Sequence, residues 1–371
     1  LGFMQTVPPV PAMIILLVLM GINLGLGALG RRVRLPAWLR PLTRAELLLV
    51  YAAVAVVPSM DRGVYVLHYL LVPAYYGNEV NKWTDFAQYY PASFIPPDPR
   101  VAANFWEGTP SGIIPWSIWL GPVAWWLTFN MLVIVAVTCL VSFFRKRWGE
   151  SERLSYPLLY LPLEITGGFA GSAHGRSFFH DPLMWVGFAI GALYNLARIL
   201  DFVLPSFPEV KTYLQLGTSL VDPPWRWIRP LNLHLMLDVW GLSYLMSGEV
   251  LLSSWLTYFL MKTVKVIGLH RGYRKSRFPF YQEVSSGACI ALLLYMLYTA
   301  RGHFRQVGRC ILHGASDYDR DEALSYRWLA ILLSLSTGAM IWMMLRAGHR
   351  LDLLLIYFAT LYMFVLVTAR I

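Results

Sequence analysis

The sequence predicts an all-α fold, a polytopic transmembrane helix bundle with about eight crossings, one re-entrant segment and broken helices. Hydrophobic residues make up 57% of the 371 residues and charged residues only 14%, whereas an ordinary soluble domain has roughly 25% charged residues. Five apolar runs also reach or approach the roughly 20 residues that a helix needs to cross a bilayer. These runs cover residues 9–29, 113–144, 182–204, 326–345 and 351–369.

The net charge of +10 comes from 31 basic and 21 acidic residues. The basic residues gather in short loops beside the apolar runs, which is typical of cytoplasmic loops of multi-pass proteins in the cell membrane. This placement favours membrane lipids as partners, and the sequence contains no nucleic-acid-binding module. The basic clusters are Arg31, Arg32, Arg34, Arg40 and Arg44; Arg145, Lys146 and Arg147; and Arg271, Arg274, Lys275 and Arg277.

The first elements follow from length and charge. Residues 9–29 form a spanning helix, and the five arginines of 31–44 place the next loop in the cytoplasm and the N-terminus outside. The run 45–76 is predicted to be one broken crossing, interrupted by PSMDRG at 58–63. The loop 77–112 has few basic residues and many aromatic ones, so we expect it outside, against the membrane interface.

The run 113–144 returns the chain to the cytoplasm, where ERLSYPLLYLPLEITGG begins at Glu152. Residues 154–168 are too few to cross and contain Pro157 and Pro162, so they predict a re-entrant segment. If a helix starts at Pro157, Pro162 leaves the carbonyl of Leu158 without a donor. Glu164 and that carbonyl are then expected at one depth, where they could hold a cation or a proton. Alternatively, this stretch lies flat on the cytoplasmic interface with Glu164 in water.

The second half is predicted to cross at 182–204, at 233–268 with an interruption by SGE at 247–249, and at 283–300. Arg301, Arg305 and Arg309 follow, one face of a surface helix that could meet lipid phosphates. The loops on both sides of the crossing at 283–300 are basic, so the charges do not fix the topology beyond residue 270. The last two helices are expected at 326–346 and 349–371.

The interrupted runs point to a binding site, because broken helices present unpaired N–H and C=O groups to a substrate. Each interruption carries an acid: Asp61, beside Arg62, and Glu249. We therefore predict Asp61, Arg62, Glu164 and Glu249 as substrate- or ion-binding residues that share one cavity. Alternatively, the breaks are surface loops with solvated charges. Asp238 is expected near the outer interface.

Signals for an enzyme are weaker. SAHGRSFFHD places His174, His180 and Asp181 near one another, but their spacing gives no common helical face for a metal. DYDRDE at 317–322 begins like a calcium loop but has Glu322 where glycine is needed. The three cysteines, Cys139, Cys289 and Cys310, indicate neither a disulfide framework nor a zinc site. We therefore expect no catalytic residue, metal or cofactor.

Two stretches, ERLSYPLLYLPLE at 152–164 and DRDEALSYRWLAI at 319–331, resemble an uncharacterised family of large prokaryotic multi-pass membrane proteins. LTRAELLLVY at 42–51 and the closing TARI support the resemblance. This family is sometimes likened to oligopeptide transporters. The resemblance implies the membrane class and assigns no catalytic residue.

Three functions remain open. The favoured one is a secondary transporter of a small polar solute or peptide, coupled to a proton or a cation. The others are a membrane-embedded enzyme acting on a lipid-linked substrate and a non-catalytic subunit of a membrane complex. Broken helices at mid-depth would favour transport, whereas acids and histidines gathered at one membrane face would favour an enzyme. Both chain ends look cut, so we expect residues 1–371 to form a single integral membrane domain of a longer protein.

Overall fold

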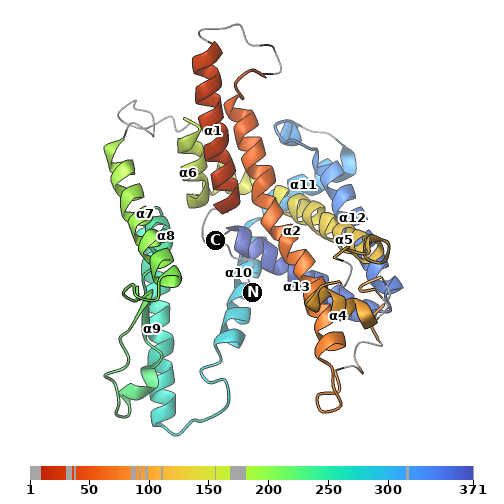
Figure 1. The fold of residues 1–371 in the computed structure, drawn as a ribbon. Coiled ribbons are helices and arrows are strands. Elements are labelled where there is room, and N and C mark those ends of the chain that lie inside the picture. Colours follow the sequence, from red (N-terminus) through yellow and green to blue (C-terminus); the bar gives the residue numbers. More distant parts are fainter. Residues whose placement is uncertain are drawn as a thin grey trace. The chain divides into compact units, whose positions relative to one another are not determined.

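The computed structural model is almost entirely helical and divides into two compact units (Figure 1). Unit 1 comprises residues 1–55 and 155–284, and unit 2 comprises residues 56–154 and 285–371. This division leaves the single membrane domain as a prediction. The structure describes residues 10–30, 36, 39–83, 85, 89–91, 93–96, 99–109, 112–154, 156–167, 181–314 and 317–370, with backbone only at 28, 57–64, 99, 157 and 317.

Helix α2 contributes residues to both units and is longer than the sequence led us to expect. It runs without interruption over 33 residues, so the predicted break at 58–63 is wrong. Proline inside a helix removes one hydrogen bond, and glycine costs about 1 kcal/mol, but packing supplies most helix stability. Buried Leu47 and Tyr51 lie before the proline, and buried Leu67 and Leu71 lie after it. Packing on both sides therefore supports one continuous helix, Arg44–Tyr76.

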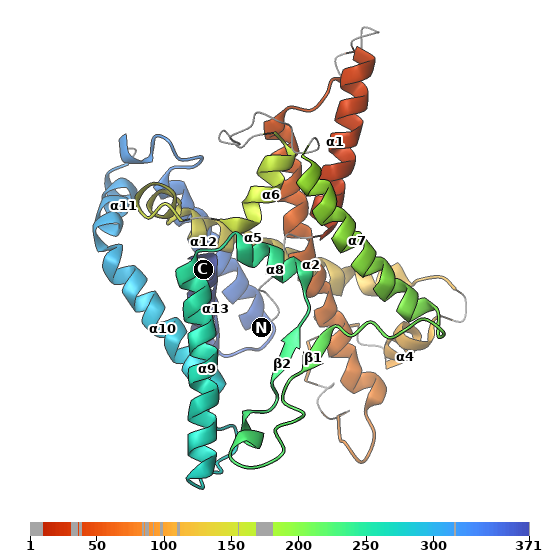
Figure 2. The same cartoon turned by 90° about the vertical axis from the view of Figure 1, so that its left-hand side faces the viewer.

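Unit 1 contains the first part of α2 and two groups of elements. In the first group, Leu16 of α1, Tyr51 of α2 and Ile165 of α6 share a hydrophobic cluster. In the second, the strands β1 and β2 pair antiparallel, with Leu214 opposite Leu233, and η4 packs on α9 (Figure 2). The elements are α1 (Val10–Gly30), α6 (Pro157–Ile165), α7 (Pro182–Val203), β1 (Tyr213–Gln215), η4 (Trp225–Ile228), β2 (Asn232–His234), α8 (Leu237–Tyr244) and α9 (Gly248–His270).

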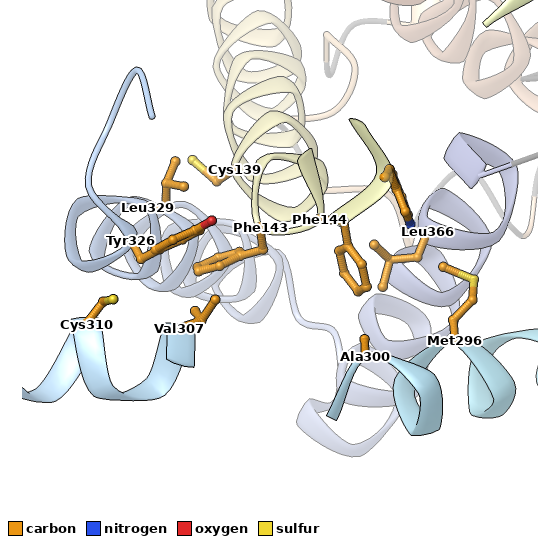
Figure 3. Close-up of a cluster of buried hydrophobic side chains, with 11 residues drawn as sticks. Cys139, Phe143, Phe144, Met296, Ala300, Val307, Cys310, Tyr326, Leu329 and Leu366 are labelled. Carbon is orange, nitrogen blue, oxygen red and sulfur yellow. The ribbon is translucent and has the colours of Figure 1, made fainter. Parts of the chain in front are cut away.

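Unit 2 is organised around three long helices that lie side by side, α5, α12 and α13 (Figure 1). Its buried side chains form three clusters, of which two line α5 and the largest surrounds Phe143 and Tyr326 (Figure 3). The elements are the second part of α2, α4 (Pro99–Glu107), α5 (Trp116–Ser142), η2 (Arg147–Ser151), α10 (Tyr281–Thr299, from residue 285), α11 (Arg301–His313), η5 (Asp317–Asp319), α12 (Tyr326–Arg346) and α13 (Leu351–Arg370).

Contacts at the two ends of α5 fix the directions of these helices. At its C-terminal end, Phe143 stacks on Tyr326, the first residue of α12, with ring centroids 6.0 Å apart. At its N-terminal end, the indole of Trp126 donates to the Phe94 carbonyl at 3.1 Å, and Phe94 stacks on His349, which follows α12. Helices α5 and α12 are therefore antiparallel. The end of α5 and α11 lie on the same side of unit 2, because His303 contacts the Phe143 carbonyl, while the membrane topology beyond residue 270 stays a prediction.

Aromatic side chains gather near the end of α4. The ring of Trp106 lies 4.4 Å from that of His68 and 5.8 Å from that of Tyr75, measured between centroids. The hydroxyl of Tyr75 donates to the carboxylate of Glu107 at 2.9 Å. Such amphipathic rings are enriched at the membrane–water interface.

Six helices in the described part of the chain are long and apolar enough to cross a membrane. They are α1, α5, α7, α9, α12 and α13. The count becomes seven if α10 and α11, which meet at a bend of 66°, form one span. The all-helical fold and several helices long enough to cross a membrane are thus confirmed, whereas the predicted eight crossings are not.

Candidate functional site

Polar and charged side chains meet where α5 ends. We call this group the α5-end cluster and define it as residues 143–154, α11, residues 317–329 and Arg370. Two stretches that carry the family resemblance, the start of 152–164 and most of 319–331, enter it together with Arg370 of the closing TARI. This arrangement identifies the cluster as one of two candidate sites.

His303 of α11 is the central polar residue of the α5-end cluster, and only 7% of its surface is exposed. Its Nε2 lies 2.7 Å from the carbonyl oxygen of Phe143, so this nitrogen donates. Its Nδ1 lies 2.6 Å from the hydroxyl of Tyr318. Burial raises the pKa of Tyr318, so at neutral pH the phenol keeps its proton and donates it to Nδ1. Both ring nitrogens of a neutral His303 are thus engaged.

Two further bonds fasten the 317–322 segment to the residues after α5. The ammonium of Lys146 donates to the Tyr318 carbonyl at 2.9 Å and lies 4.4 Å from the centroid of the Tyr318 ring. The guanidinium of Arg145 binds the carboxylate of Glu322 at 2.5 Å, and only 4% of the Glu322 side chain is exposed. The acidic turn at 317–322 is therefore partly buried, and its Glu322 is paired.

Replacing Arg145 by glutamine is expected to lower the free energy of unfolding by about 1–3 kcal/mol, because a nearly buried carboxylate loses its charged partner. Thermal unfolding of the purified chain in detergent, followed by tryptophan fluorescence, measures the change. Arg320→Gln is the matched control, since Arg320 is an exposed arginine of the same segment. Equal unfolding midpoints for the two variants would contradict the expectation.

Glu152 joins the end of α13 to the α5-end cluster. Its carboxylate accepts from Arg147 at 2.8 Å and from Arg370 at 3.2 Å. All three side chains are largely shielded from solvent. The first acid of the family-like stretch 152–164 therefore has a structural partner at the far end of the sequence.

The second candidate site lies in unit 1, on α9. Helix α8 ends at Tyr244 and α9 begins at Gly248, so the predicted interruption at 247–249 is confirmed to within two residues. The non-helical chain before α8 packs back on α9 through η4 (Figure 2). Tyr194 of α7 also holds this chain, because its hydroxyl donates to the Leu235 carbonyl at 3.0 Å. An irregular segment is thus anchored to two candidate spanning helices.

Lys262 is the ionisable residue at the centre of this second site. It is only 8% exposed, although it belongs to an apolar helix. Its ammonium donates to the carbonyls of Ile228 at 3.0 Å and Pro230 at 2.5 Å. One turn later, the ammonium of Lys265 donates to the Arg229 carbonyl at 2.7 Å. We call Lys262, Lys265 and residues 228–230 the lysine–carbonyl site.

The guanidinium of Arg229 turns away from α9 and binds its own segment. It donates to the carbonyls of Gly217 at 2.6 Å and of Thr218. Among the described residues, no carboxylate forms an ion pair with the three cations of this region, Arg229, Lys262 and Lys265. The lysine–carbonyl site is therefore rich in basic groups and has no acidic partner among the described residues.

The predicted residues Asp61 and Arg62 lie in the continuous part of α2 that belongs to unit 2. Their side chains lie outside the described part of the structure. The other two predicted residues, Glu164 and Glu249, belong to unit 1. A cavity shared by these four residues therefore stays a prediction.

Glu164 lies half-buried in the last turn of α6. This helix has Pro157 in its first turn, as predicted, and its nine residues are too few to cross a membrane. Re-entry itself stays a prediction, because residues 168–180 lie outside the described part. The helix continues through Pro162, so six residues separate Glu164 from Leu158 by about 9 Å along its axis, and their common depth in a membrane stays a prediction.

Glu249 is exposed in the first turn of α9, directly after the confirmed interruption. A carboxylate is favoured there by the N–H groups and the dipole at a helix N-terminus. Asp238 has the same position in α8. Both acids therefore have a role in stabilising a helix start, which does not require a ligand.

The weaker metal motifs receive no support from the residues that can be seen. His174 and His180 lie outside the described part, and Asp181 caps α7 by accepting from the Leu183 amide at 2.9 Å. In the described part of the chain, no three His, Cys, Asp or Glu residues are grouped as metal ligands.

Sequence reasoning missed Lys262 and His303 as site residues. Lys262 carried a usable signal, because a lysine inside an apolar run is costly unless it faces protein or water. His303 carried a weaker one, because it occupies the apolar face of a helix whose arginines are on the opposite side. Neither partner could be found from sequence, since Ile228 and Phe143 are 34 and 160 residues away.

The model of a family described as a family of unknown function (DUF6785) matches residues 2–371. No curated protein and no solved structure matches the chain. The resemblance to an uncharacterised family is thus confirmed, whereas the likeness to oligopeptide transporters stays a prediction.

Proposed function

The chain belongs to the DUF6785 family, whose function is unknown, and on that premise we propose that it is a secondary-transporter-like protein of the cell membrane. It moves a small polar solute or peptide, coupled to a proton or a metal cation. The observation that carries this proposal is the binding of the Ile228 and Pro230 carbonyls by Lys262.

The position of Lys262 along α9 makes this observation relevant to transport. Lys262 follows Gly248, the first residue of α9, by 14 residues, which is about 21 Å along a helix whose 23 residues measure about 34 Å. If α9 crosses the membrane, Lys262 and the non-helical residues 229 and 230, which directly follow η4, lie within the roughly 30 Å hydrocarbon core. Non-helical backbone is tolerated there only when it is buried in protein or lines a water-filled cavity. Interrupted helices beside such backbone are typical of transporter binding sites.

The chemistry of the lysine–carbonyl site suits a solute with an anionic group. An ammonium has three N–H donors, of which Lys262 uses two and Lys265 one for the carbonyls. The remaining donors can bind a carboxylate, such as the C-terminus of a short peptide. The carbonyl oxygens can in turn accept a hydrogen bond from an amine or coordinate a metal cation.

The proposal is tested by uptake into proteoliposomes that contain the purified full chain. Radiolabelled dialanine is the probe, and an inward proton gradient is imposed or omitted. We expect uptake above that of protein-free liposomes, increased by the gradient. Uptake equal to that of protein-free liposomes for dialanine and for a panel of labelled di- and tripeptides and amino acids would refute the proposed transport of peptides.

The predicted coupling acids are tested in the same assay. Asp61→Asn, Glu164→Gln and Glu249→Gln are expected to fold normally, and neutralising the coupling acid should abolish the increase caused by the proton gradient. The reason is that an amide cannot take up and release the proton. Thermal stability and expression are measured for each variant, with Glu79→Gln, an exposed acid between α2 and α4, as the control. Unchanged coupling in all three variants would exclude these acids.

A membrane-embedded enzyme acting on a lipid-linked substrate is the second candidate function. The observation that favours it is the gathering of His303, Glu322 and Glu152 at one end of unit 2. Against it, both nitrogens of His303 are engaged and each carboxylate is paired with an arginine. These groups stabilise the fold, so transport, or a non-catalytic role in a membrane complex, explains the α5-end cluster more directly.

A further inference from the structure

Helix α11 leaves the line of α10 abruptly. The two helices meet at a bend of 66° around Ala300, which is 1% exposed. Helix α10 is apolar, whereas α11 contains Arg301, Arg305 and Arg309 and no acidic residue. A helix that turns sharply away from an apolar one and becomes basic is placed to run along a membrane surface.

One face of α11 is already occupied. His303, Val307 and Cys310 are buried in the α5-end cluster, and Figure 3 shows Val307 and Cys310 directed toward Tyr326. The bonds of His303 to Phe143 and Tyr318 hold this face in place. The orientation of the opposite face is therefore fixed by the packing.

The opposite face is basic and partly apolar. Arg301, Arg305 and Arg309 are exposed and recur every four residues, about 6 Å apart along the axis. Leu312, 81% exposed, lies on the same side of the helix. The guanidinium of Arg301 lies 4.6 Å from the ring centroid of Tyr298, which is 64% exposed. Among the described residues, none of the three arginines forms an ion pair with an acid.

We propose that this face of α11, which comprises Arg301, Arg305, Arg309 and Leu312, binds the phosphate groups of anionic phospholipids together with Tyr298 at the end of α10. Guanidinium groups bind phosphate through two parallel hydrogen bonds. Leu312 and Tyr298 supply apolar surface for the boundary between headgroups and acyl chains, where tyrosine is enriched. Three cations without acidic partners complement an anionic lipid surface. An acidic protein partner would use the arginines but would leave the exposed leucine unexplained.

The side of the membrane follows from the contacts of unit 2. His303 binds the carbonyl of Phe143, directly before the basic sequence Arg145, Lys146 and Arg147. Such a cluster beside a spanning helix is cytoplasmic in most membrane proteins, and the cytoplasmic leaflet is the anionic one. The α11 face therefore meets the leaflet whose charge it complements.

The test compares the purified full chain with a variant in which all three arginines are glutamine, R301Q/R305Q/R309Q. Each is titrated in detergent with dioleoylphosphatidylglycerol or dioleoylphosphatidylcholine, and the thermal unfolding midpoint is followed by tryptophan fluorescence. We expect phosphatidylglycerol to raise the midpoint of the wild type more than phosphatidylcholine does. The variant should bind phosphatidylglycerol on the order of 100-fold more weakly, since each basic residue near an anionic surface contributes roughly a factor of five.

The matched control is R226Q/R320Q/R327Q, which removes the same charge from exposed arginines outside the α11 face and outside the basic clusters named above. It should keep the response to phosphatidylglycerol, and an equal loss in both triple variants would reduce the effect to general electrostatics and overturn the proposal. An equal rise with inorganic phosphate would indicate a free-phosphate site, and an equal rise with polyglutamate would indicate an acidic protein partner. Either result overturns the proposal. Because all the substituted arginines are exposed, both variants are expected to unfold at the wild-type midpoint when no lipid is added. If the midpoint without lipid were lowered only in the α11 variant, the three arginines of α11 would have a structural role, and this result would also overturn the proposal.

Discussion

Replacing Lys262 by methionine is expected to reduce uptake into proteoliposomes to the background of protein-free liposomes. Methionine keeps much of the apolar stem but supplies no donor for the carbonyls of Ile228 and Pro230. Segment 228–230 then loses its attachment to α9, and the proposed site loses its buried charge. The measurement is the initial rate of dialanine uptake, normalised to the amount of reconstituted protein.

The same substitution is expected to lower the free energy of unfolding by about 1–3 kcal/mol, because two carbonyls lose their charged partner. Lys275→Met is the matched control, since it removes a lysine from an exposed loop and should leave uptake unchanged. Lys262→Arg keeps the charge and the donors and should retain part of the activity if the fold is preserved. Wild-type uptake by Lys262→Met would show that the lysine–carbonyl site has no part in transport.

Replacing His303 by alanine is expected to cost about 3–5 kcal/mol of unfolding free energy, the largest effect on stability that we predict. The substitution leaves a cavity in a packed cluster. It also leaves the Phe143 carbonyl and the Tyr318 hydroxyl without the ring that pairs with them. Unfolding of the purified chain by heat or by sodium dodecyl sulfate, followed by tryptophan fluorescence, measures the change.

His313→Ala provides the comparison, because His313 is an exposed histidine of the same helix whose ring lies 3.3 Å from the Arg309 carbonyl. Tyr318→Phe removes only the hydroxyl partner and should cost about 1 kcal/mol. We expect the loss of unfolding free energy to be largest for His303→Ala, smaller for Tyr318→Phe and smallest for His313→Ala. Equal losses for the two histidine variants would contradict the role assigned to His303.

The sequence by itself determined the helices whose length and polarity suffice to define them. Helix α12 was predicted at 326–346 and is found at Tyr326–Arg346, and α1, α5, α7, α10 and α13 lie within three residues of their predicted ends. A long apolar run must form its backbone hydrogen bonds internally, wherever the rest of the chain lies. Composition therefore fixed the membrane class as well.

The sequence predicted helix breaks less well, because a proline or glycine inside an apolar run is compatible with either a break or a continuous helix. Pro58 and Gly63 suggested a break in α2, but the helix continues. No proline marks the bend at Ala300, and yet α10 and α11 meet there at 66°. In both places the packing of the flanking residues decides the backbone path, and packing partners are distant in sequence.

Both candidate sites were decided by the tertiary structure alone. The carbonyl that His303 binds is 160 residues earlier, and the arginine that Glu152 binds is 218 residues later. Likewise, the sequence shows Lys262 only as a cation within an apolar run. Its hydrogen-bond acceptors are supplied by the backbone of residues 228–230, which packs on α9 in the folded chain. A side chain's type is local information, whereas its hydrogen-bond partners depend on how distant segments pack, and that arrangement turns these residues into sites.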